Sequence, residues 1–321
     1  MPVPTIFIDG EHGTTGLEIR ERLASRTDLE ILSLARARAK DDGAKREVLA
    51  AADCVILCLP DEAARATVAL IDASDHRRTR VIDASSAHRT ADGWVYGFAE
   101  MSQGQRAAIA AAARVSNPGC YPTGFIALVR PLRERGLLPA DYPLSVHAVS
   151  GYSGGGRRMI DSFERPPAGV APQAFGAYGL GLDHKHLAEM QRHGLLAAPP
   201  VFSPAVGRFA RGMLVLVPLH LGHLPGVSAE RLHAAYVEHF AGEPFVTVRA
   251  LNDRSVLRDG AFLEPEALNG SNRLELFVYA DDARGQALLV ARLDNLGKGA
   301  SGAAIQNLNL MLGRPESAGL R

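Results

Sequence analysis

Three glycines directly after the first apolar run constrain the fold of this chain most. Residues 5–9 are typical of a short buried strand, and a helix-forming segment begins beyond the glycines. A glycine turn between a strand and a helix can hold a pyrophosphate, because its amides and the positive helix end face the ligand. The pattern G-x-x-G-x-x-G differs from the common G-x-G-x-x-G and alone also fits a plain tight turn. Its position favours dinucleotide binding, and the predicted contacts are Gly10, Gly13, Thr14, Thr15 and Gly16.

Strand-like and helix-like segments alternate through the first third of the chain. The Ala-rich residues 62–73 fit a crossover helix between the apolar runs at 54–59 and 81–83. This alternation predicts an α/β domain of Rossmann type, with a parallel sheet covered by helices on both faces.

The pattern changes beyond residue 115, where strand-like segments follow one another with fewer helices between them. These segments are residues 144–150, 213–221, 245–249, 274–279 and 287–293. They predict an α+β domain with a mixed or antiparallel sheet. Residues 165–183 are rich in Pro, Gly and Ala without periodicity and are predicted as a long loop.

Charge balance and cysteine count exclude several classes of protein. The 321 residues carry 35 Lys and Arg against 35 Asp and Glu, so no net field gathers nucleic acid or anionic lipid. The N-terminus has no signal-peptide pattern, and no apolar run reaches roughly 18 residues. Three cysteines are too few for a disulfide framework, and Cys54 and Cys58 fit one face of a buried strand. We expect a cytoplasmic protein that binds neither nucleic acid nor membrane.

The end of the second predicted strand bears on the choice of nicotinamide cofactor. An acidic residue there would select NAD through the adenosine ribose. Here Arg36 and Arg38 occur, and no carboxylate precedes Asp41. The basic cluster predicts NADP, with Arg36 and then Arg38 on the 2′-phosphate, and the alternative interpretation is a solvated charge run.

Cys120 lies in a turn ahead of the apolar residues 125–129, which are typical of a buried helix, and Pro122 suits an early helical position. A thiol at a helix N-terminus lies in a positive field that favours the thiolate. A single cysteine is more often inert, but its combination with a dinucleotide loop favours a catalytic nucleophile.

A thiolate nucleophile needs a partner for proton transfer, and His184 and His186 are the candidates. The spacing H-x-H also occurs in zinc sites, but no cysteine cluster or H-E-x-x-H accompanies it, so no metal is expected. Which histidine is the principal acid/base stays open, and a histidine packed on a helix face is the structural alternative.

Two further functions remain as alternatives. Residues 151–155 match G-x-S-x-G after a strand, so a serine hydrolase could use Ser153 with Asp183 and His184. A non-catalytic NADP sensor would bind the dinucleotide without turning it over. The hydrolase leaves the glycine loop and the basic strand end without a purpose.

Seven segments together resemble the N-acetyl-gamma-glutamyl-phosphate reductase family, which acts in arginine biosynthesis. They are residues 8–16, 83–86, 96–100, 116–123, 150–154, 184–186 and 295–302. They span nearly the whole chain in order, and Asn-Pro-Gly-Cys-Tyr-Pro-Thr at 117–123 is the most specific. Related aspartate-semialdehyde dehydrogenases usually place a different residue before the cysteine.

The resemblance implies a nucleotide-binding domain over residues 1–116, completed by the C-terminal helix at 300–321, and a catalytic and oligomerisation domain over 117–299. It implies NADPH-dependent reduction of an acyl phosphate, N-acetyl-glutamyl 5-phosphate, through a Cys120 thioester. His184 would be the acid/base, with Tyr178 and His186 supporting the site. Contacts near the nicotinamide half of the cofactor would come from Ser150, Gly151, Ser153, Gly154, Asn295 and Gly299.

The chain resembles the short class of this family, since residues 204–213 depart from the pattern of the longer form. Substrate contacts in that stretch therefore do not carry over directly from the longer form. The candidate substrate contacts are Arg211 in that stretch and Asn117 shortly before the cysteine. The family implies a homodimer or homotetramer. Aspartate-semialdehyde and aminoadipate-semialdehyde dehydrogenases are the nearest alternative activities, because sequence patterns do not reveal the substrate's length or its acetyl group.

Overall fold

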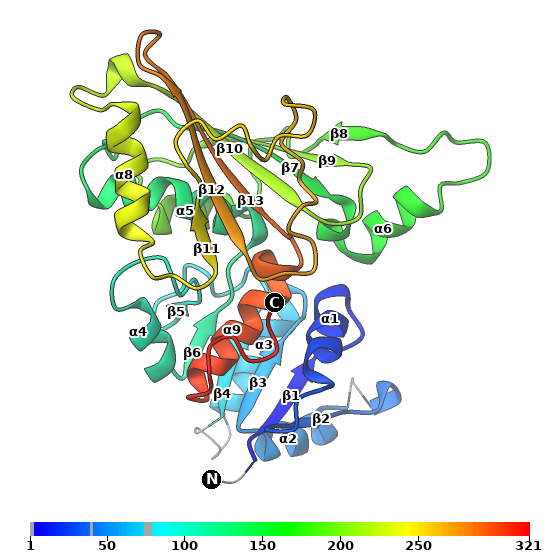
Figure 1. Cartoon of the computed structure of the whole chain (residues 1–321). Coiled ribbons are helices and arrows are strands. Elements are labelled where there is room, and N and C mark those ends of the chain that lie inside the picture. Colours follow the sequence, from blue (N-terminus) through cyan, green and yellow to red (C-terminus); the bar gives the residue numbers. More distant parts are fainter. Residues whose placement is uncertain (1–2, 39–40, 74–78) are drawn as a thin grey trace. The chain divides into compact units, whose positions relative to one another are not determined.

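The structure is a computed structural model that describes residues 3–38, 41–73 and 79–321. By its internal contacts the chain divides into two compact units (Figure 1). The first unit comprises Met1–Ala99, Gly104–Pro118 and Ala300–Arg321, and the second comprises Glu100–Gln103 and Gly119–Gly299.

The first unit contains a six-stranded sheet in the order β2-β1-β3-β4-β6-β5, in which every paired strand is parallel. The strands are β1 (Thr5–Asp9), β2 (Glu30–Leu32), β3 (Cys54–Leu57), β4 (Arg80–Asp83), β5 (Val95–Tyr96) and β6 (Arg114–Ser116). The helices are α1 (Thr14–Leu23), α2 (Asp42–Ala51), α3 (Asp61–Asp72), α4 (Gln105–Ala111) and α9 (Gly302–Met311). The predicted Rossmann-like sheet is confirmed.

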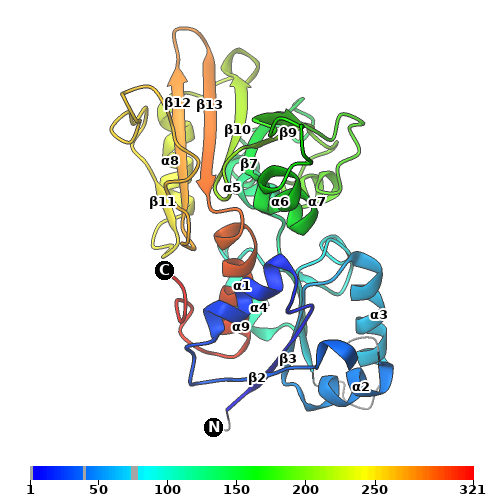
Figure 2. The same ribbon diagram turned by 90° about the vertical axis from the view of Figure 1, so that its right-hand side faces the viewer.

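Apolar side chains on both faces of this sheet explain its two helical layers. Because side chains alternate along a strand, Ile6 and Ile8 of β1 lie in one apolar cluster and Phe7 in another. The first cluster includes residues of α1, α4 and α9, and the second includes residues of α2 and α3. Figure 2 shows these two groups of helices on opposite sides of the sheet.

The second unit contains a seven-stranded sheet in the order β11-β12-β13-β10-β7-β9-β8. This sheet is mixed, which confirms the predicted α+β class. Its strands are β7 (Ser145–Gly151), β8 (Phe175–Ala177), β9 (Val201–Gly207), β10 (Met213–His220), β11 (Val246–Val248), β12 (Leu274–Asp281) and β13 (Gln286–Leu293). Pairs β7·β9 and β11·β12 are parallel, and the others are antiparallel. Its helices are α5 (Cys120–Glu134), α6 (Gly156–Glu164), α7 (Leu187–His193) and α8 (Ala229–His239).

Helix α5 packs on β10 and β13, and its Gly124 allows this close approach. A Cβ atom at Gly124 would lie 2.8 Å from a methyl group of Val215. Helix α8 packs on β12 beside α5.

The predicted long loop at 165–183 is partly wrong, because β8 lies inside it and pairs with β9 through Phe175 and Gly207. Three residues at a sheet edge are too short to show the alternation that identifies a strand.

Arg80 links two helix ends of the first unit. Its guanidinium donates to the carbonyl oxygens of Ala110 and Ala112 at the end of α4 and of Met311 at the end of α9. We expect Arg80→Leu to lower the free energy of unfolding by about 2–3 kcal/mol, since three carbonyls lose a charged donor. Urea denaturation measures this loss. Arg46→Leu, at an exposed position of α2, is the control, and an equal loss in both variants would contradict the assignment.

Candidate active site

The glycine loop joins β1 to α1 in the first unit and packs too closely for side chains. Gly10 has a φ of 92°, and a Cβ atom there would lie 2.4 Å from the carbonyl oxygen of Cys58. A Cβ atom at Gly16 would lie 2.3 Å from the Gly10 oxygen. Helix α1 begins at Thr14, and no side-chain hydrogen bond caps it at Gly13 in the described part of the chain. Its first amides can therefore bind an anion.

Glu11 is a buried carboxylate of this loop that sequence reasoning missed. It is 6% exposed, accepts a hydrogen bond of 2.5 Å from Arg20 and a second of 3.2 Å from Ser33 Oγ. Ser33 directly follows β2, so Glu11 ties the glycine loop to the predicted ribose end of the sheet. A carboxylate between two glycines of such a loop gave no recognisable signal.

Of the two arginines predicted to bind the 2′-phosphate, the structure describes the side chain of Arg38. The Arg38 side chain is 55% exposed and lies 3.6 Å from Asp41 and 4.0 Å from Glu47. The side chain of Arg36 lies outside the described residues. Selection of NADP by these residues stays a prediction.

In the second unit, Cys120 is the first residue of α5 and is half-buried. Gly119 precedes the helix in an extended conformation, and its carbonyl accepts from both the amide and the hydroxyl of Thr123. The predicted turn and helix are thus present, and the thiol lies at the positive end of a helix of 15 residues.

Glu189 holds the turn before Cys120 and was not predicted. Its carboxylate, on α7, is 1% exposed and accepts a hydrogen bond of 2.7 Å from the Gly119 amide. Glu189 follows His186 by three residues, so the spacing H-x-H-x-x-E was the available signal.

Several aromatic and imidazole rings gather around Tyr121, the residue that follows Cys120. The His184 ring lies 4.7 Å from His186, 5.8 Å from Tyr178 and 6.2 Å from Tyr121, measured between ring centres. Phe202 of β9 completes the group, 5.1 Å from His184. The structure therefore brings the candidates Tyr178, His184 and His186 together around Tyr121, the residue that follows Cys120.

The backbone sets the tautomer of His184. The amide of His186 donates to His184 Nδ1 over 3.2 Å, so Nδ1 is an acceptor and the proton of the neutral ring is on Nε2. Burial, and next the positive charge of Lys185, lower the pKa of His184 below its ordinary value of 6.5. His184 is therefore neutral at neutral pH and can donate through Nε2.

The two tyrosines form a chain with a fixed direction. The Ala205 carbonyl can only accept, so Tyr121 donates to it over 3.2 Å and accepts from Tyr178 over 3.0 Å. Burial raises the pKa of Tyr178 to about 12, although its bond to Tyr121 acts in the opposite direction. Both phenols stay protonated near neutral pH.

The Asn295 side chain links several of the residues that are predicted to lie near the nicotinamide. Its side chain accepts from the Gly212 amide over 2.8 Å and donates to Ser153 Oγ over 3.0 Å. A Cβ atom at Gly154 would lie 3.3 Å from both the Asn295 amide nitrogen and Ser150 Oγ. An amide is no base, so this contact at Ser153 does not support a hydrolase nucleophile.

Three other predicted residues have definite environments. A Cβ atom at Gly299 would lie 2.8 Å from Cys120 Cβ, so the backbone at Gly299 packs directly on the cysteine. Asn117, in the first unit, is 1% exposed; its amide donates to Ala300 and accepts from Asn307, which favours a structural role over the predicted substrate contact. Arg211 is 37% exposed and lies 4.0 Å from Asp294.

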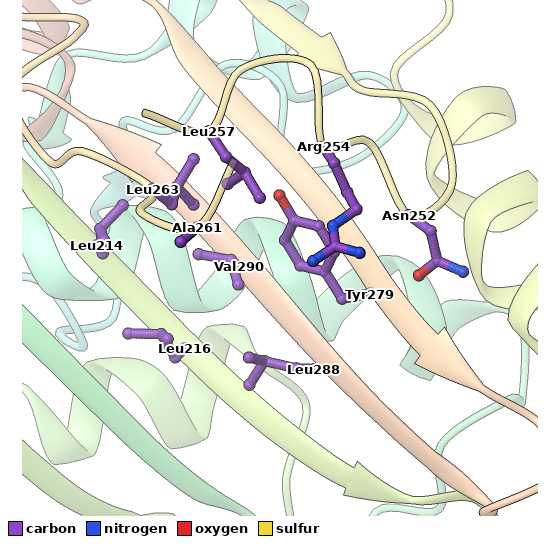
Figure 3. Close-up of a pocket in the computed structure, with 10 residues that line it drawn as sticks. All are labelled: Leu214, Leu216, Asn252, Arg254, Leu257, Ala261, Leu263, Tyr279, Leu288 and Val290. Atoms are coloured by element: carbon purple, nitrogen blue, oxygen red, sulfur yellow. The ribbon is translucent and has the colours of Figure 1, made fainter. Parts of the chain in front are cut away.

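A pocket of about 550 Å³ lies elsewhere in the second unit, on the sheet face opposite α5 (Figure 3). It is lined by Leu214, Leu216, Asn252, Arg254, Leu257, Ala261, Leu263, Tyr279, Leu288 and Val290. Its apolar lining, with Arg254 as the charged side chain, does not offer acid/base chemistry.

Two structural features, a metal-binding cluster and a membrane-spanning helix, are absent among the described residues. No group of three or more His, Cys, Asp or Glu side chains there has the arrangement of a metal site. Among the same residues, no helix has the length and hydropathy needed to span a membrane.

Known proteins match both units. The family described as "Semialdehyde dehydrogenase, NAD binding domain" matches residues 5–111, and "Semialdehyde dehydrogenase, dimerisation domain" matches residues 120–295. Aspartate semialdehyde dehydrogenase II from Vibrio cholerae, in complex with ASA, shares the fold with a TM-score of 0.70 at 14% identity, covering 97% of this chain and 99% of that one. The enzyme from Francisella tularensis has a TM-score of 0.69 at 13% identity, covering 96% and 100%.

The chain belongs to the semialdehyde dehydrogenase family of oxidoreductases, with an NAD(P)-binding domain. Its curated relatives specify the branch. N-acetyl-gamma-glutamyl-phosphate reductase of Trichormus variabilis is 54% identical over 100% of both chains, and that of Burkholderia cenocepacia is 52% identical over 99% of this chain and 100% of the relative. The chain is a member of this reductase family, and the resemblance found in the sequence is confirmed.

Proposed function

We propose that this chain uses NADPH to reduce N-acetyl-glutamyl 5-phosphate to N-acetyl-glutamate 5-semialdehyde and phosphate, a step of arginine biosynthesis. Relatives named for this reaction, similar over the whole chain, support the substrate. The observation that carries the chemistry is Cys120 at the first position of α5, in one unit with the rings of His184, His186 and Tyr178.

Cys120 is the proposed nucleophile. Its sulfur attacks the acyl carbonyl carbon, the carbon–oxygen bond to phosphate breaks, and the thiol proton leaves with the phosphate. The product of this step is a thioester on Cys120. The positive end of α5 favours the thiolate, and Glu189 holds the Gly119 turn from which the helix starts.

His184 is the proposed proton donor to the oxygen of the reacting carbonyl. Its Nε2 proton can be donated to the oxyanion that forms when sulfur or hydride adds to the carbon. The backbone amide of His186 supports this geometry by its hydrogen bond to His184 Nδ1. Tyr178 supports it from its hydrogen bond to Tyr121. When the carbon–sulfur bond breaks, the aldehyde forms and Cys120 regains a proton.

Two sets of residues are the proposed contacts of the dinucleotide. The glycine loop is the proposed pyrophosphate site, because the first amides of α1 have no side-chain cap at Gly13 among the described residues. Ser150, Gly151, Ser153, Gly154, Asn295 and Gly299 are the proposed contacts of the nicotinamide half. Bound NADPH supplies the hydride that reduces the thioester carbon.

NADP is the proposed form of the cofactor. We expect a KM for NADPH at least about 10-fold below that for NADH, because Arg36 and Arg38 would pair with the 2′-phosphate. Arg38→Ala should raise the KM for NADPH and leave that for NADH unchanged. Steady-state kinetics measure both KM values, and Arg65→Ala, at an exposed position of α3, is the control. A KM for NADH below that for NADPH in the native protein would refute the preference for NADP.

Association of copies is also proposed, as a homodimer or homotetramer. The matched dimerisation domain and the apolar pocket face of the second sheet support it. Sedimentation velocity at micromolar concentration gives the assembly directly, and a monomer there would rule it out.

The reverse reaction tests the proposed function. N-acetylglutamate semialdehyde, phosphate and NADP should give NADPH absorbance that depends on phosphate and is blocked by iodoacetamide. Activity with aspartate semialdehyde alone would instead identify a sister enzyme. Binding of NADP without turnover would favour a sensor.

A further inference from the structure

Lys298 and Glu100 form a buried ion pair in the second unit that the proposed chemistry does not use. Lys298 Nζ lies 2.7 Å and 2.8 Å from the two carboxylate oxygens of Glu100, and the side chains are 1% and 0% exposed. The ring of Phe245 lies 5.6 Å from the ammonium, and His239 Nε2 donates to the Glu100 carbonyl over 3.3 Å. The pair is therefore buried beside the end of α8 and the residue that precedes β11.

The position of Lys298 in the chain connects this pair to Cys120. Lys298 lies between two glycines in the π-helical turn Gly297–Ser301. A Cβ atom at Gly297 would lie 2.1 Å from the Ser271 oxygen, and one at Gly299 would lie 2.8 Å from Cys120 Cβ. Residues 297, 298 and 299 thus each contact a different segment of the second unit, and Lys298 is the one held by an ion pair.

A π-helical turn is a rare departure from the α-helix that occurs frequently at functional sites. A buried ion pair is weak evidence for stability, because desolvation of both charges offsets their attraction, but it does fix geometry. Both considerations favour a role in placing the turn over a role in overall stability.

We infer that Lys298 is a positioning residue, whose ion pair with Glu100 holds the backbone of residues 297–299 against Cys120 and so sets the place of the nucleophile. This inference rests on the proposed role of Cys120. The Gly299 backbone contacts the cysteine Cβ, so a shift of the turn moves the sulfur or leaves it unsupported. A displacement of about 1 Å at a reacting group can cost 10²-fold in rate.

The test uses the double variant Lys298→Met/Glu100→Leu, because it removes both charges and leaves no unpaired carboxylate beside Phe245. We expect its melting temperature to stay near that of the native protein, while kcat falls by about 100-fold and the KM for phosphate changes less than about 3-fold. The rate of Cys120 alkylation by iodoacetamide, followed by mass spectrometry, should fall by about 10-fold.

Arg292→Met/Glu275→Leu is the matched control. It removes another buried ion pair of the same unit, in which Arg292 Nε donates to Glu275 over 3.0 Å across β12 and β13. This control should keep the native alkylation rate and kcat. Gly299→Ala, which perturbs the contact itself, should reproduce the loss without touching the ion pair.

Native kcat and alkylation in the Lys298/Glu100 variant would overturn the inference, as would an equal loss in the Arg292/Glu275 control. If the Lys298/Glu100 variant does not fold, Gly299→Ala decides: native alkylation there overturns the inference as well. Alkylation at Cys120 is read separately from turnover. An active Cys120→Ala enzyme would therefore defeat the proposed mechanism, whereas unchanged alkylation would defeat this inference alone.

Discussion

Cys120→Ala is expected to lower kcat by at least about 10⁴-fold in the reverse assay, because the variant has no sulfur to form the thioester. The loss should fall on kcat, with NADP affinity retained, since Cys120 is not one of the proposed dinucleotide contacts. Fluorescence titration with NADPH measures the affinity alongside the rate.

Cys58→Ala is the matched control for this loss. Burial, and next the charges of Asp83 and Asp9, raise the pKa of Cys58 to about 12, so its thiol stays protonated and unreactive. The control should retain activity and its inactivation by iodoacetamide. Turnover above a trace in Cys120→Ala, or loss of iodoacetamide sensitivity in Cys58→Ala, would contradict the assignment of the nucleophile.

His184→Ala is expected to lower kcat by about 10²–10³-fold, because the oxyanion loses the Nε2 donor. His186→Ala should cost less, since the backbone amide of His186, and not its ring, orients His184. His223→Ala, at an exposed position, serves as the unaffected control. A larger loss at His186 than at His184 would reverse the assignment of the two histidines.

The pH dependence of the native enzyme follows from the same geometry. Burial lowers the pKa of His184 below 6.5, so the ring stays neutral until the pH falls below that value. Protonation would place a hydrogen on Nδ1 opposite the His186 amide and break the bond that orients the ring. We therefore expect an acidic limb of kcat with a midpoint below pH 6.5, absent in His184→Ala. A midpoint above 6.5 would disagree with the buried neutral ring.

Local features were predicted well from the sequence. The glycine loop and the Cys120 turn each lie within a few residues of the strand or helix that defines them, so residue type and position sufficed. The order of strand-like and helix-like segments predicted both sheets, while β8, with three residues, was too short to be recognised as a strand.

Features built from distant residues were not predicted. Glu189 is 70 positions from Gly119, and Glu100 is 198 positions from Lys298, so only the folded chain shows that they meet. The environment of Asn117 is of the same kind, because α9 supplies its Asn307 partner from the other end of the chain. Local patterns do not show which distant residue such a side chain contacts.

The thioester on Cys120 is the central claim, and one measurement tests it most directly. The enzyme is mixed with N-acetylglutamate semialdehyde and NADP without phosphate, quenched in acid and digested, and the Cys120 peptide is weighed. The account predicts a burst of NADPH of about one per active site and an N-acetylglutamyl group on Cys120. NADPH formation with an unmodified Cys120, or with the acyl group on Ser153, would contradict it.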